Sequence, residues 1–420
     1  MKTNEITPIP QGYKATPLGI IPQEWEVEPL YYLGQIYSGG TPDTEVEEYW
    51  NGDIAWCTPS DITKLDTKYI ESTEVKITVK GLKESSATLL PPRSIVVCTR
   101  ATIGTAAICN TEIATNQGFK NIIPNEKANP EWLYFIIIYS KLRLVRLGCG
   151  STFLEVSKKD FSRFKIPVPP LAEQKKIAEV LGLWDKAIEK QSQLIEQLTL
   201  RKRGLMQQLL TAKRRLPVFS GPWKKVRLGE ICERVTRKNT EDNKNVMTIS
   251  AQRGFVVQTD FFNKSVASET LESYYLVFKD EFCYNKSYSN GYPMGAIKRL
   301  SEADKAVVTS LYICFKVKSS MRVSIDYLAY YFDNGGLNKG LTKIANEGGR
   351  AHGLLNVTPT DFLGLMFGIP SFEEQTAIAQ VLTAADREIE LAQQKLELLR
   401  QQKRGLMQQL LTGKKRVKYE

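Results

Sequence analysis

KRGLMQQLLT occupies residues 202–211, and the same ten residues return at 403–412. A chance match of that length within 420 residues is negligible, so the chain contains an internal repeat. Without a gap, 22 of the 39 residues of 173–211 recur in 374–412. Upstream of these segments the two halves have little sequence in common. The two repeated C-terminal segments therefore share one function. The unlike segments upstream of them perform the same kind of function on different targets.

Both repeated segments predict long helices. Their apolar residues alternate at spacings of four and three over about five heptads, which is the pattern of a coiled-coil seam. The predicted seam residues are Ile177, Leu181, Trp184, Ile188, Ile195, Leu198, Leu205 and Leu209 in the first copy and Ile378, Leu382, Ile389, Leu396, Leu399, Leu406 and Leu410 in the second.

Both seams are interrupted at the same step by a lysine, Lys202 and Lys403, a polar break that favours one register. Two residues later each copy has a glycine, Gly204 and Gly405. Glycine costs a helix about 1 kcal/mol relative to alanine, so its recurrence predicts a close backbone approach or a bend at this point, with a surface glycine of no structural role as the alternative.

The unlike segments predict mixed α and β structure. RSIVVCT (93–99) and LYICFKV (311–317) are short β-rich runs, and WLYFIIIYSKLRLV (132–145) predicts a helix. The expected fold class is α+β, with two globular mixed α/β domains separated by two long antiparallel coiled-coil helices in a pseudo-two-fold repeat. The expected boundaries are residues 1–172 for the first domain, 173–215 for the first helix, 216–373 for the second domain and 374–420 for the second helix.

The order of domain and helix restricts the geometry. A helix of 39 residues is about 58 Å long, so the first helix would hold the two globular domains apart. The second helix has to run back antiparallel to bury its seam on the first. Duplex DNA has local two-fold axes, as such a helix pair does. Because the domains differ, they would read different half-sites, and the helices would set the gap between them.

The composition points to a polyanionic partner. The formal net charge is +11, and the excess lies beyond residue 172. The N-terminal residues contain no apolar run, and LYFIIIY (133–139) is too short to span a bilayer. Seven scattered cysteines with no CxxC pair are typical of reduced thiols. We therefore expect a cytoplasmic protein that binds nucleic acid and no membrane.

The sequence offers little for catalysis. His352 is the single histidine, which excludes HNH nucleases and most histidine-based acid–base schemes, and no GxxxxGK[ST] phosphate loop is present. Pro42-Asp43 followed by Asp66-Thr67-Lys68 fits a loose PD…DxK nuclease pattern, but the pattern has no counterpart in the second half. We expect no metal site and no catalytic residue. A free-standing DNA nuclease or methyltransferase is the alternative reading, and a coiled-coil scaffold that binds no DNA is a third.

The chain resembles the specificity subunit of type I restriction–modification systems over essentially its whole length. The resemblance rests on two repeated motifs, IPVPPLAEQKKIAEVL (166–181) and IPSFEEQTAIAQVL (369–382). Each is followed further along the chain by KRGLMQQLLT. In the first half SGGTP (38–42), AWCTPSDI (55–62) and GSTFLEVSKKDF (150–161) also fit. The second half has no equivalent of SGGTP or TPSDI, so its assignment rests on position.

The resemblance implies two target-recognition domains, each reading one half of a bipartite asymmetric DNA site. It implies helices that act as a spacer and as a dock for two modification (methyltransferase) subunits. It also implies that adenine-N6 methylation with S-adenosylmethionine, and cleavage with ATP and Mg²⁺ by restriction/translocase subunits, belong to the partners. This chain would then bind double-stranded DNA, hold no cofactor and be non-catalytic by itself.

Polar residues and glycines in predicted turns and loops are the candidates for DNA contact. Arginine and lysine pair with guanine edges, asparagine and glutamine pair with adenine, and glycine allows a phosphate to approach the backbone. The candidates are Ser38, Gly39, Gly40, Thr41, Arg100, Thr102, Asn116, Gln117 and Lys120 in the first domain and Gln252, Arg253, Lys286, Tyr288, Ser289 and Arg350 in the second.

Overall fold

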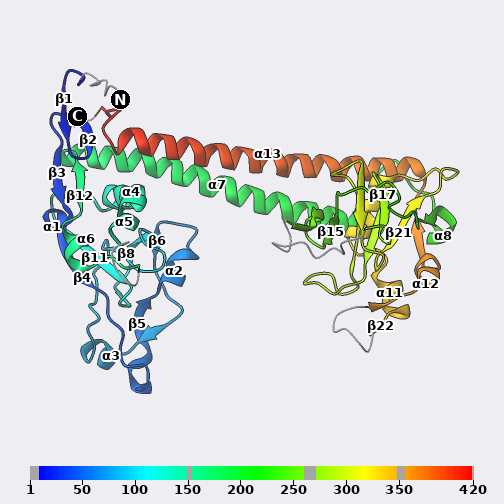
Figure 1. The fold of residues 1–420 in the computed structure, drawn as a ribbon, viewed down its shortest axis with the longest axis horizontal. Coiled ribbons are helices and arrows are strands. Elements are labelled where there is room, and N and C mark those ends of the chain that lie inside the picture. The colour runs from blue at the N-terminus through cyan, green and yellow to red at the C-terminus, as the bar shows by residue number, and fades with distance from the viewer. Residues whose placement is uncertain (1–8, 149–153, 260–270, 348–354, 419–420) are drawn as a thin grey trace. The chain divides into compact units, whose positions relative to one another are not determined.

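The computed structural model describes residues 9–148, 154–259, 271–347 and 355–418, and the chain forms two compact units (Figure 1). Unit 1 combines Met1–Leu194 with Ala392–Glu420, and unit 2 is Ile195–Leu391. Two helices of 39 residues each, α7 (Leu171–Leu209) and α13 (Phe372–Leu410), contribute to both units. Each unit therefore contains one mixed α/β domain and one stretch of each long helix. Among the helices that the structure describes, none has the length and apolarity that a membrane span requires.

A five-stranded sheet forms the centre of unit 1, with the strand order β4-β11-β8-β9-β6. The strands are β4 (Gly34–Ser38), β6 (Tyr69–Ile70), β8 (Ile95–Cys98), β9 (Ala106–Cys109) and β11 (Phe119–Pro124). All neighbours pair antiparallel except β6 and β9, which pair parallel. The runs IVVC of β8 and AAIC of β9 are buried at every position, because these strands lie in the interior of the sheet with both faces covered.

Smaller sheets complete unit 1. They pair β5 (Trp50–Cys57) with both β10 (Ile113–Thr115) and β7 (Lys76–Ile77), β1 (Tyr13–Thr16) with β2 (Gly19–Pro22), and β3 (Glu26–Pro29) with β12 (Lys165–Val168). The helices are α1 (Leu30–Leu33), η1 (Glu47–Tyr49), α2 (Pro59–Thr63), α3 (Val79–Lys83), α4 (Pro130–Tyr139), α5 (Lys141–Gly148) and α6 (Lys158–Ser162).

The single helix expected over 132–145 consists of two helices, because the helical structure is interrupted at Ser140 between α4 and α5. Helix α4 is apolar on all sides and packs into the core through Trp132, Phe135 and their neighbours. Helix α5 buries only one face and exposes charged residues on the other. A change of direction at Ser140 allows a buried helix to be followed by a surface helix.

Unit 2 has a four-stranded antiparallel sheet, β14 (Cys232–Arg234), β21 (Ile313–Val317), β18 (Phe282–Asn285) and β19 (Ala296–Arg299), in that order. Its two-stranded pairs are β13 (Lys224–Arg227) with β24 (Met366–Ile369), β15 (Met247–Ser250) with β16 (Gly254–Val257), β17 (Tyr275–Phe278) with β20 (Lys305–Val308), and β22 (Asn346–Glu347) with β23 (Leu355–Asn356). Its helices include α8 (Leu228–Ile231), α10 (Ile325–Asp333), α11 (Asn338–Ile344) and α12 (Pro359–Leu363). The stacked rings of Phe282 with Phe315 and of Tyr284 with Phe362 fill the core.

Within each unit the stretches of α7 and α13 run antiparallel (Figure 1). In unit 1, Lys403 pairs with Asp185. The symmetry-related pair in unit 2 joins Lys202 to Asp386. Every predicted seam residue is buried or half-buried. The most deeply buried of them lie at the helix ends and belong to the domain cores, namely Ile177, Leu181 and Leu410 in unit 1 and Leu209, Ile378 and Leu382 in unit 2.

The two glycines of the repeat have no packing role. A Cβ atom built on Gly204 or Gly405 would meet no atom within 4 Å, and both helices continue through these positions without interruption. The close backbone approach expected from the sequence is therefore wrong, because these positions meet no neighbouring atom.

The glutamate of the repeated Glu-Gln pair anchors the end of each unit's helix pair. Glu173 is fully buried and accepts hydrogen bonds from Trp25 Nε1 at 2.9 Å and from Arg416 Nε at 2.7 Å. Glu374 in unit 2 is 1% exposed and accepts from Arg215 Nε at 2.7 Å. In both units, therefore, the first turn of one long helix is tied to the segment that follows the other long helix.

The glutamine of the pair ties each long helix to its domain. The side-chain oxygen of Gln174 accepts from the Asn129 backbone N–H at 2.9 Å, immediately before α4. Gln375 accepts from the Ser324 N–H at 2.9 Å, immediately before α10. Their amide nitrogens donate to the carbonyls of Pro169 and Pro370 respectively. The spacing of proline and Glu-Gln in the sequence is thus explained by hydrogen bonding.

We predict that Arg416→Ala destabilises unit 1 by about 2–4 kcal/mol, because it leaves the buried Glu173 carboxylate without its cation. The guanidinium is partly exposed, which keeps the effect below that of a fully buried pair. Chemical denaturation of the full chain measures the change. Arg404→Ala, which breaks an exposed pair with Glu397, is the matched control and should leave stability essentially unchanged, because water screens the exposed pair.

The double variant Arg416→Ala with Glu173→Gln should recover much of the loss, because it removes the unpaired charge as well. Equal stability of the single variant and the wild type would show that the pair does not hold the helix ends together.

Candidate nucleic-acid interface

Three loops of unit 1 meet at one end of the five-stranded sheet. The Gly39 N–H donates to the Phe119 carbonyl at 3.1 Å, and the Gly40 N–H donates to Thr115 at 2.9 Å. The Asn116 N–H donates to the Cys57 carbonyl at 3.0 Å. The segment after β4, the end of β5 and the β10–β11 connection are therefore held side by side.

The two glycines of SGGTP are buried, and they serve this meeting of loops. A Cβ on Gly39 would lie 1.8 Å from the Asn116 carbonyl oxygen, and one on Gly40 would lie 2.3 Å from the Ala87 nitrogen. The close approach is to the chain's own backbone. Neither glycine offers its backbone to a phosphate in the way expected from the sequence.

Polar side chains of the candidate set surround this meeting point. The Thr41 hydroxyl donates to the Gln117 side-chain oxygen, and Asn116 Oδ1 accepts from the Gly118 N–H at 2.9 Å. A Cβ on Gly118 would lie 3.8 Å from Arg100 Cβ, so Arg100 stands next to the same loop. Arg100 and Gln117 are exposed, and Ser38, Thr41, Thr102 and Asn116 are half-buried. The structure thus brings most of the first-domain candidates together, with Arg100 and Gln117 open to a ligand.

Lys120 does not belong to this exposed set. It is 5% exposed, and its ammonium lies 3.4 Å from Glu155 Oε1. Its place in β11 turns the side chain inward, so its proposed role as a donor to a base edge loses its basis.

The second-domain candidates come from two neighbouring loops. Gln252, in the β15–β16 turn, donates from Nε2 to the Asn290 carbonyl at 3.1 Å. Ser289 and Tyr292 exchange backbone hydrogen bonds across the turn that contains Asn290. Tyr288 is 63% exposed, and Lys286 accepts through its carbonyl from the Leu355 N–H at 3.1 Å. Arg253 is exposed in the same turn as Gln252, whereas Arg350 lies outside the described residues.

A supporting cluster beneath these loops was missed at the sequence level. The Tyr292 hydroxyl donates to Asp333 Oδ1 at 3.2 Å, and Lys298 pairs with the same carboxylate while lying over the tyrosine ring. Burial, reinforced by the Asp333 charge, raises the pKa of Tyr292, which keeps its hydroxyl protonated as a donor. No local pattern joins residues on β19, α10 and a loop, so only the tertiary structure reveals the cluster.

The residues of the PD…DxK pattern have other partners in the structure. Lys68 of the PD…DxK pattern pairs with Asp185 of α7 at 3.0 Å, and Asp43 accepts from the Glu45 N–H. No three His, Cys, Asp or Glu side chains of the described part are placed to hold a metal ion. The six described cysteines are buried free thiols, and burial raises the pKa of Cys98 to about 11 and that of Cys109 to about 12. His352 lies outside the described residues.

Comparison of the sequence with known proteins identifies a family. Residues 22–200 and 220–401 each match the model of the type I restriction modification DNA specificity domain. The chain is 38% identical over 193 residues to the type I restriction enzyme MjaIX specificity subunit of Methanocaldococcus jannaschii, an alignment that covers 45% of each protein. It is 24% identical over 427 residues to the MjaVIII specificity subunit of the same organism, covering 95% of this chain and 94% of that one.

The fold is also similar to a solved one. The HsdS subunit from Thermoanaerobacter tengcongensis superposes with a TM-score of 0.50 and 16% identity, over 94% of this chain and 98% of that chain. The chain thus spans less than half of the MjaIX subunit that it matches and nearly all of the MjaVIII and HsdS subunits.

We predict that Arg100→Ala lowers affinity for the cognate DNA by about 1–3 kcal/mol and relaxes selectivity in one half-site only, with unchanged thermal stability. The reason is that Arg100 is exposed beside the converging loops. Lys120→Ala should instead lower thermal stability and leave base preference unchanged, since it leaves Glu155 without its nearest cation. Selection of bound sequences from a random pool measures both preferences. Altered preference in the Lys120 variant alone would reverse the assignment of these two residues.

Proposed function

The chain belongs to the family of type I restriction–modification DNA specificity domains, and from this premise we propose that it is the specificity subunit of a type I restriction–modification complex. Each unit reads one half of a bipartite, asymmetric DNA site. The observation that carries the proposal is that two domains of this family stand in one chain, joined to a repeated helix pair but provided with unlike loops.

The unlike loops support different half-sites. Unit 1 offers Arg100 and Gln117 from connections of its five-stranded sheet, whereas unit 2 offers Gln252, Arg253 and Tyr288 from two hairpin turns. Direct readout depends on which donors and acceptors reach the base edges, so different side chains on different supports select different bases.

The long helices are proposed to dock two modification subunits. Exposed leucines interrupt their polar surface, namely Leu183, Leu194 and Leu200 on α7 and Leu391 and Leu398 on α13. Leu391 and Leu398 stand one heptad apart and so share a face. Apolar side chains on an exposed helix face are the chemistry of a protein interface, because covering them removes apolar area from water.

Catalysis is assigned to the partners. S-adenosylmethionine, ATP and Mg²⁺ are proposed to bind to the modification and restriction/translocase subunits. This chain is proposed to recognise the DNA sequence, and the complex to act in the cytoplasm. A free-standing nuclease or methyltransferase, the alternative considered from the sequence, gains no support from the comparisons.

One experiment tests the function directly. The chain is co-expressed with its modification subunits in a host that lacks such a system, and the methylome is sequenced. We expect adenine methylation at a single motif with two unlike specific parts and a fixed gap. A contiguous motif, or methylation by this chain without partners, would refute the proposal.

We predict that the paired helices set the gap of the site. Four helix-forming residues are inserted after Leu194 in α7 and after Leu391 in α13, where each helix passes from one unit to the other. Every ion pair within each unit then keeps its register. The insertion lengthens each helix by about 6 Å, close to two base-pair steps of about 3.4 Å, so the methylated motif should keep both half-sequences and gain one or two base pairs in the gap.

The control inserts one residue at each of the same two points. One residue turns the following segment by roughly 100°, so this variant should lose methylation although it adds only about 1.5 Å. An unchanged gap in the four-residue variant, or altered half-sequences, would show that the helices are not the spacer.

We also predict that the double variant Leu391→Glu with Leu398→Glu weakens assembly with the modification subunits by roughly tenfold to a hundredfold per residue. This factor corresponds to the free energy that is lost when one leucine side chain is no longer buried at the interface. Gln393→Glu with Arg400→Glu, at exposed positions with the same spacing on the opposite face, should leave assembly intact. Analytical ultracentrifugation of the mixed subunits measures the difference. Equal assembly of the two double variants would exclude this face as the dock.

A further inference from the structure

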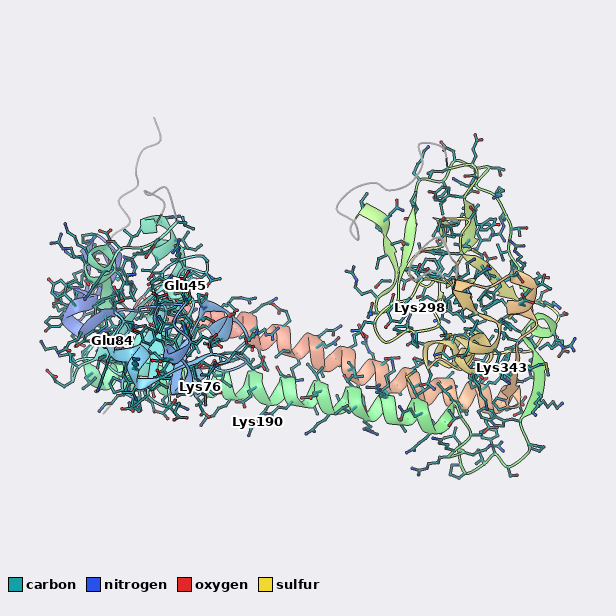
Figure 2. All side chains as sticks on the ribbon, turned by 90° about the horizontal axis from the view of Figure 1, so that it is seen from below. Glu45, Lys76, Glu84, Lys190, Lys298 and Lys343 are labelled. Carbon is teal, nitrogen blue, oxygen red and sulfur yellow. The ribbon has the colours of Figure 1, made fainter. Side chains whose placement is uncertain are left out.

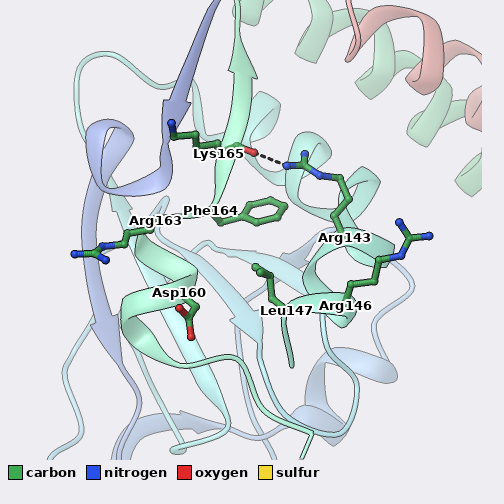
Figure 3. A pocket seen from close by; sticks show the side chains of 7 residues that line it. All are labelled: Arg143, Arg146, Leu147, Asp160, Arg163, Phe164 and Lys165. Carbon is green, nitrogen blue, oxygen red and sulfur yellow. Dashed lines mark hydrogen bonds between the residues drawn. The ribbon is translucent and has the colours of Figure 1, made fainter. Parts of the chain in front are cut away.

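Unit 1 has a pocket that is rich in cationic residues (Figure 3). It has a volume of about 420 Å³ and is formed by α5, the end of α6 and the start of β12. Its lining residues are Arg143, Arg146, Leu147, Asp160, Arg163, Phe164 and Lys165. Four cationic residues and one carboxylate thus line it.

The charges of this pocket are largely uncompensated. Asp160 already accepts a hydrogen bond from the Ser157 hydroxyl at 2.6 Å, which caps α6. Arg143 is held in place, since it donates to the Lys165 carbonyl at 2.7 Å and lies over the Phe164 ring. Arg146, Arg163 and Lys165 are exposed, and within the described residues none of them pairs with a carboxylate. The surroundings of the pocket therefore carry one fixed guanidinium and three exposed cations that have no carboxylate partner in the described part of the chain.

Unit 2 has a pocket at the equivalent place. Its lining includes residues of α11, α12, β24 and β13, with Lys225, Lys339 and Lys343 as its cations. Asp361 is its carboxylate, and it accepts from the Thr358 hydroxyl at 2.6 Å as Asp160 does from Ser157. All three lysines are exposed, and the described part of the chain contains no ion-pair partner for them. The feature recurs although the arginines of unit 1 are replaced by lysines at other positions.

Each pocket is one short helix away from the candidate recognition loops of its unit. In unit 1 Arg100 forms a bridge with Glu155, and α6 then leads to Arg163 and the pocket. In unit 2 the Leu355 N–H bonds to Lys286, and α12 then leads to its pocket. The same connection thus joins a loop that differs between the units to a pocket that they share.

We propose that the two pockets bind backbone phosphates of the DNA duplex beside each half-site, an inference that rests on the proposed function. The two half-sites have different bases but the same sugar-phosphate backbone. A feature that both units repeat, next to loops that they do not, suits the part of the ligand that is the same. Clustered guanidinium and ammonium groups without carboxylate partners are the groups that neutralise phosphates.

Salt dependence tests the inference on the full chain with a 20-base-pair duplex of random sequence as probe. Variant 1 carries Arg146→Gln, Arg163→Gln and Lys165→Gln, and variant 2 carries Lys225→Gln, Lys339→Gln and Lys343→Gln. Arg143 is left unchanged because it packs against Phe164. The control carries Lys186→Gln, Lys190→Gln and Lys395→Gln, which remove the same charge from exposed positions on the long helices (Figure 2 labels Lys190).

Each lost phosphate contact should make the plot of log affinity against log salt less steep by about 0.9. We expect a decrease of about one to two in each pocket variant, the sum of both decreases in the combined variant, and no change of slope in the control. Thermal midpoints equal to that of the wild type show that the variants are folded. Slopes of the pocket variants equal to that of the control would overturn the inference.

Two further arms separate the alternatives. Poly-glutamate represents an acidic protein surface. Loss of poly-glutamate binding in the pocket variants, with an unchanged slope for DNA, would overturn the inference in favour of a protein partner.

Selection of bound sequences from a random pool tests the proposed function independently. Retained half-site preference together with a lower slope supports phosphate binding, whereas a wild type without sequence preference but with the slope difference would refute the proposed function and leave the pockets as phosphate sites.

Discussion

A buried carboxylate at the first turn of each long helix determines how the two long helices pair within each unit. Glu173 and Glu374 are almost completely removed from water, and a buried carboxylate is stable only when it is paired and hydrogen-bonded. Each finds its arginine on the segment that follows the opposite helix, at Arg416 and Arg215. Satisfying these two charges requires the helices to be antiparallel within each unit, and it fixes which residues face one another. The Lys403–Asp185 and Lys202–Asp386 pairs then stand in the same register.

Much of this arrangement could be predicted from the sequence, because the repeat carries it. The heptad spacing located the seams, and the repeated KRGLMQQLLT located their ends. The glycines were misread, since Gly204 and Gly405 meet no neighbour, and a repeated residue need not have a packing role. The structural role of the Glu-Gln pair could not be predicted, because the hydrogen-bond partners of Glu173, Trp25 and Arg416, lie far from it in the sequence.

The candidate interface was predictable only in part. Turn residues were recognisable by type, and the loops of unit 1 do meet. Burial was not predictable, because Lys120 and Arg100 look alike in sequence and differ only in which face of the fold their backbone presents. The same holds for Gly39 and Gly40, whose glycine requirement comes from Asn116 and Ala87 on other loops. Chemical type can be read from the chain, whereas exposure is a property of the sheet register.

The way in which the units are assembled has a consequence for folding. The core of unit 1 includes Met407, Leu410 and Leu411, and the Tyr13 hydroxyl donates to the Gly413 carbonyl at 3.0 Å. Burying each of these apolar side chains contributes about 1.5–3 kcal/mol, a large fraction of the stability of an ordinary domain. Unit 1 therefore completes its core only after the last helix has been synthesised, while unit 2 has all of its residues in one continuous segment. The shared helices thus couple the formation of the first domain to the presence of the second, so a chain that stops before α13 lacks part of the core of both units.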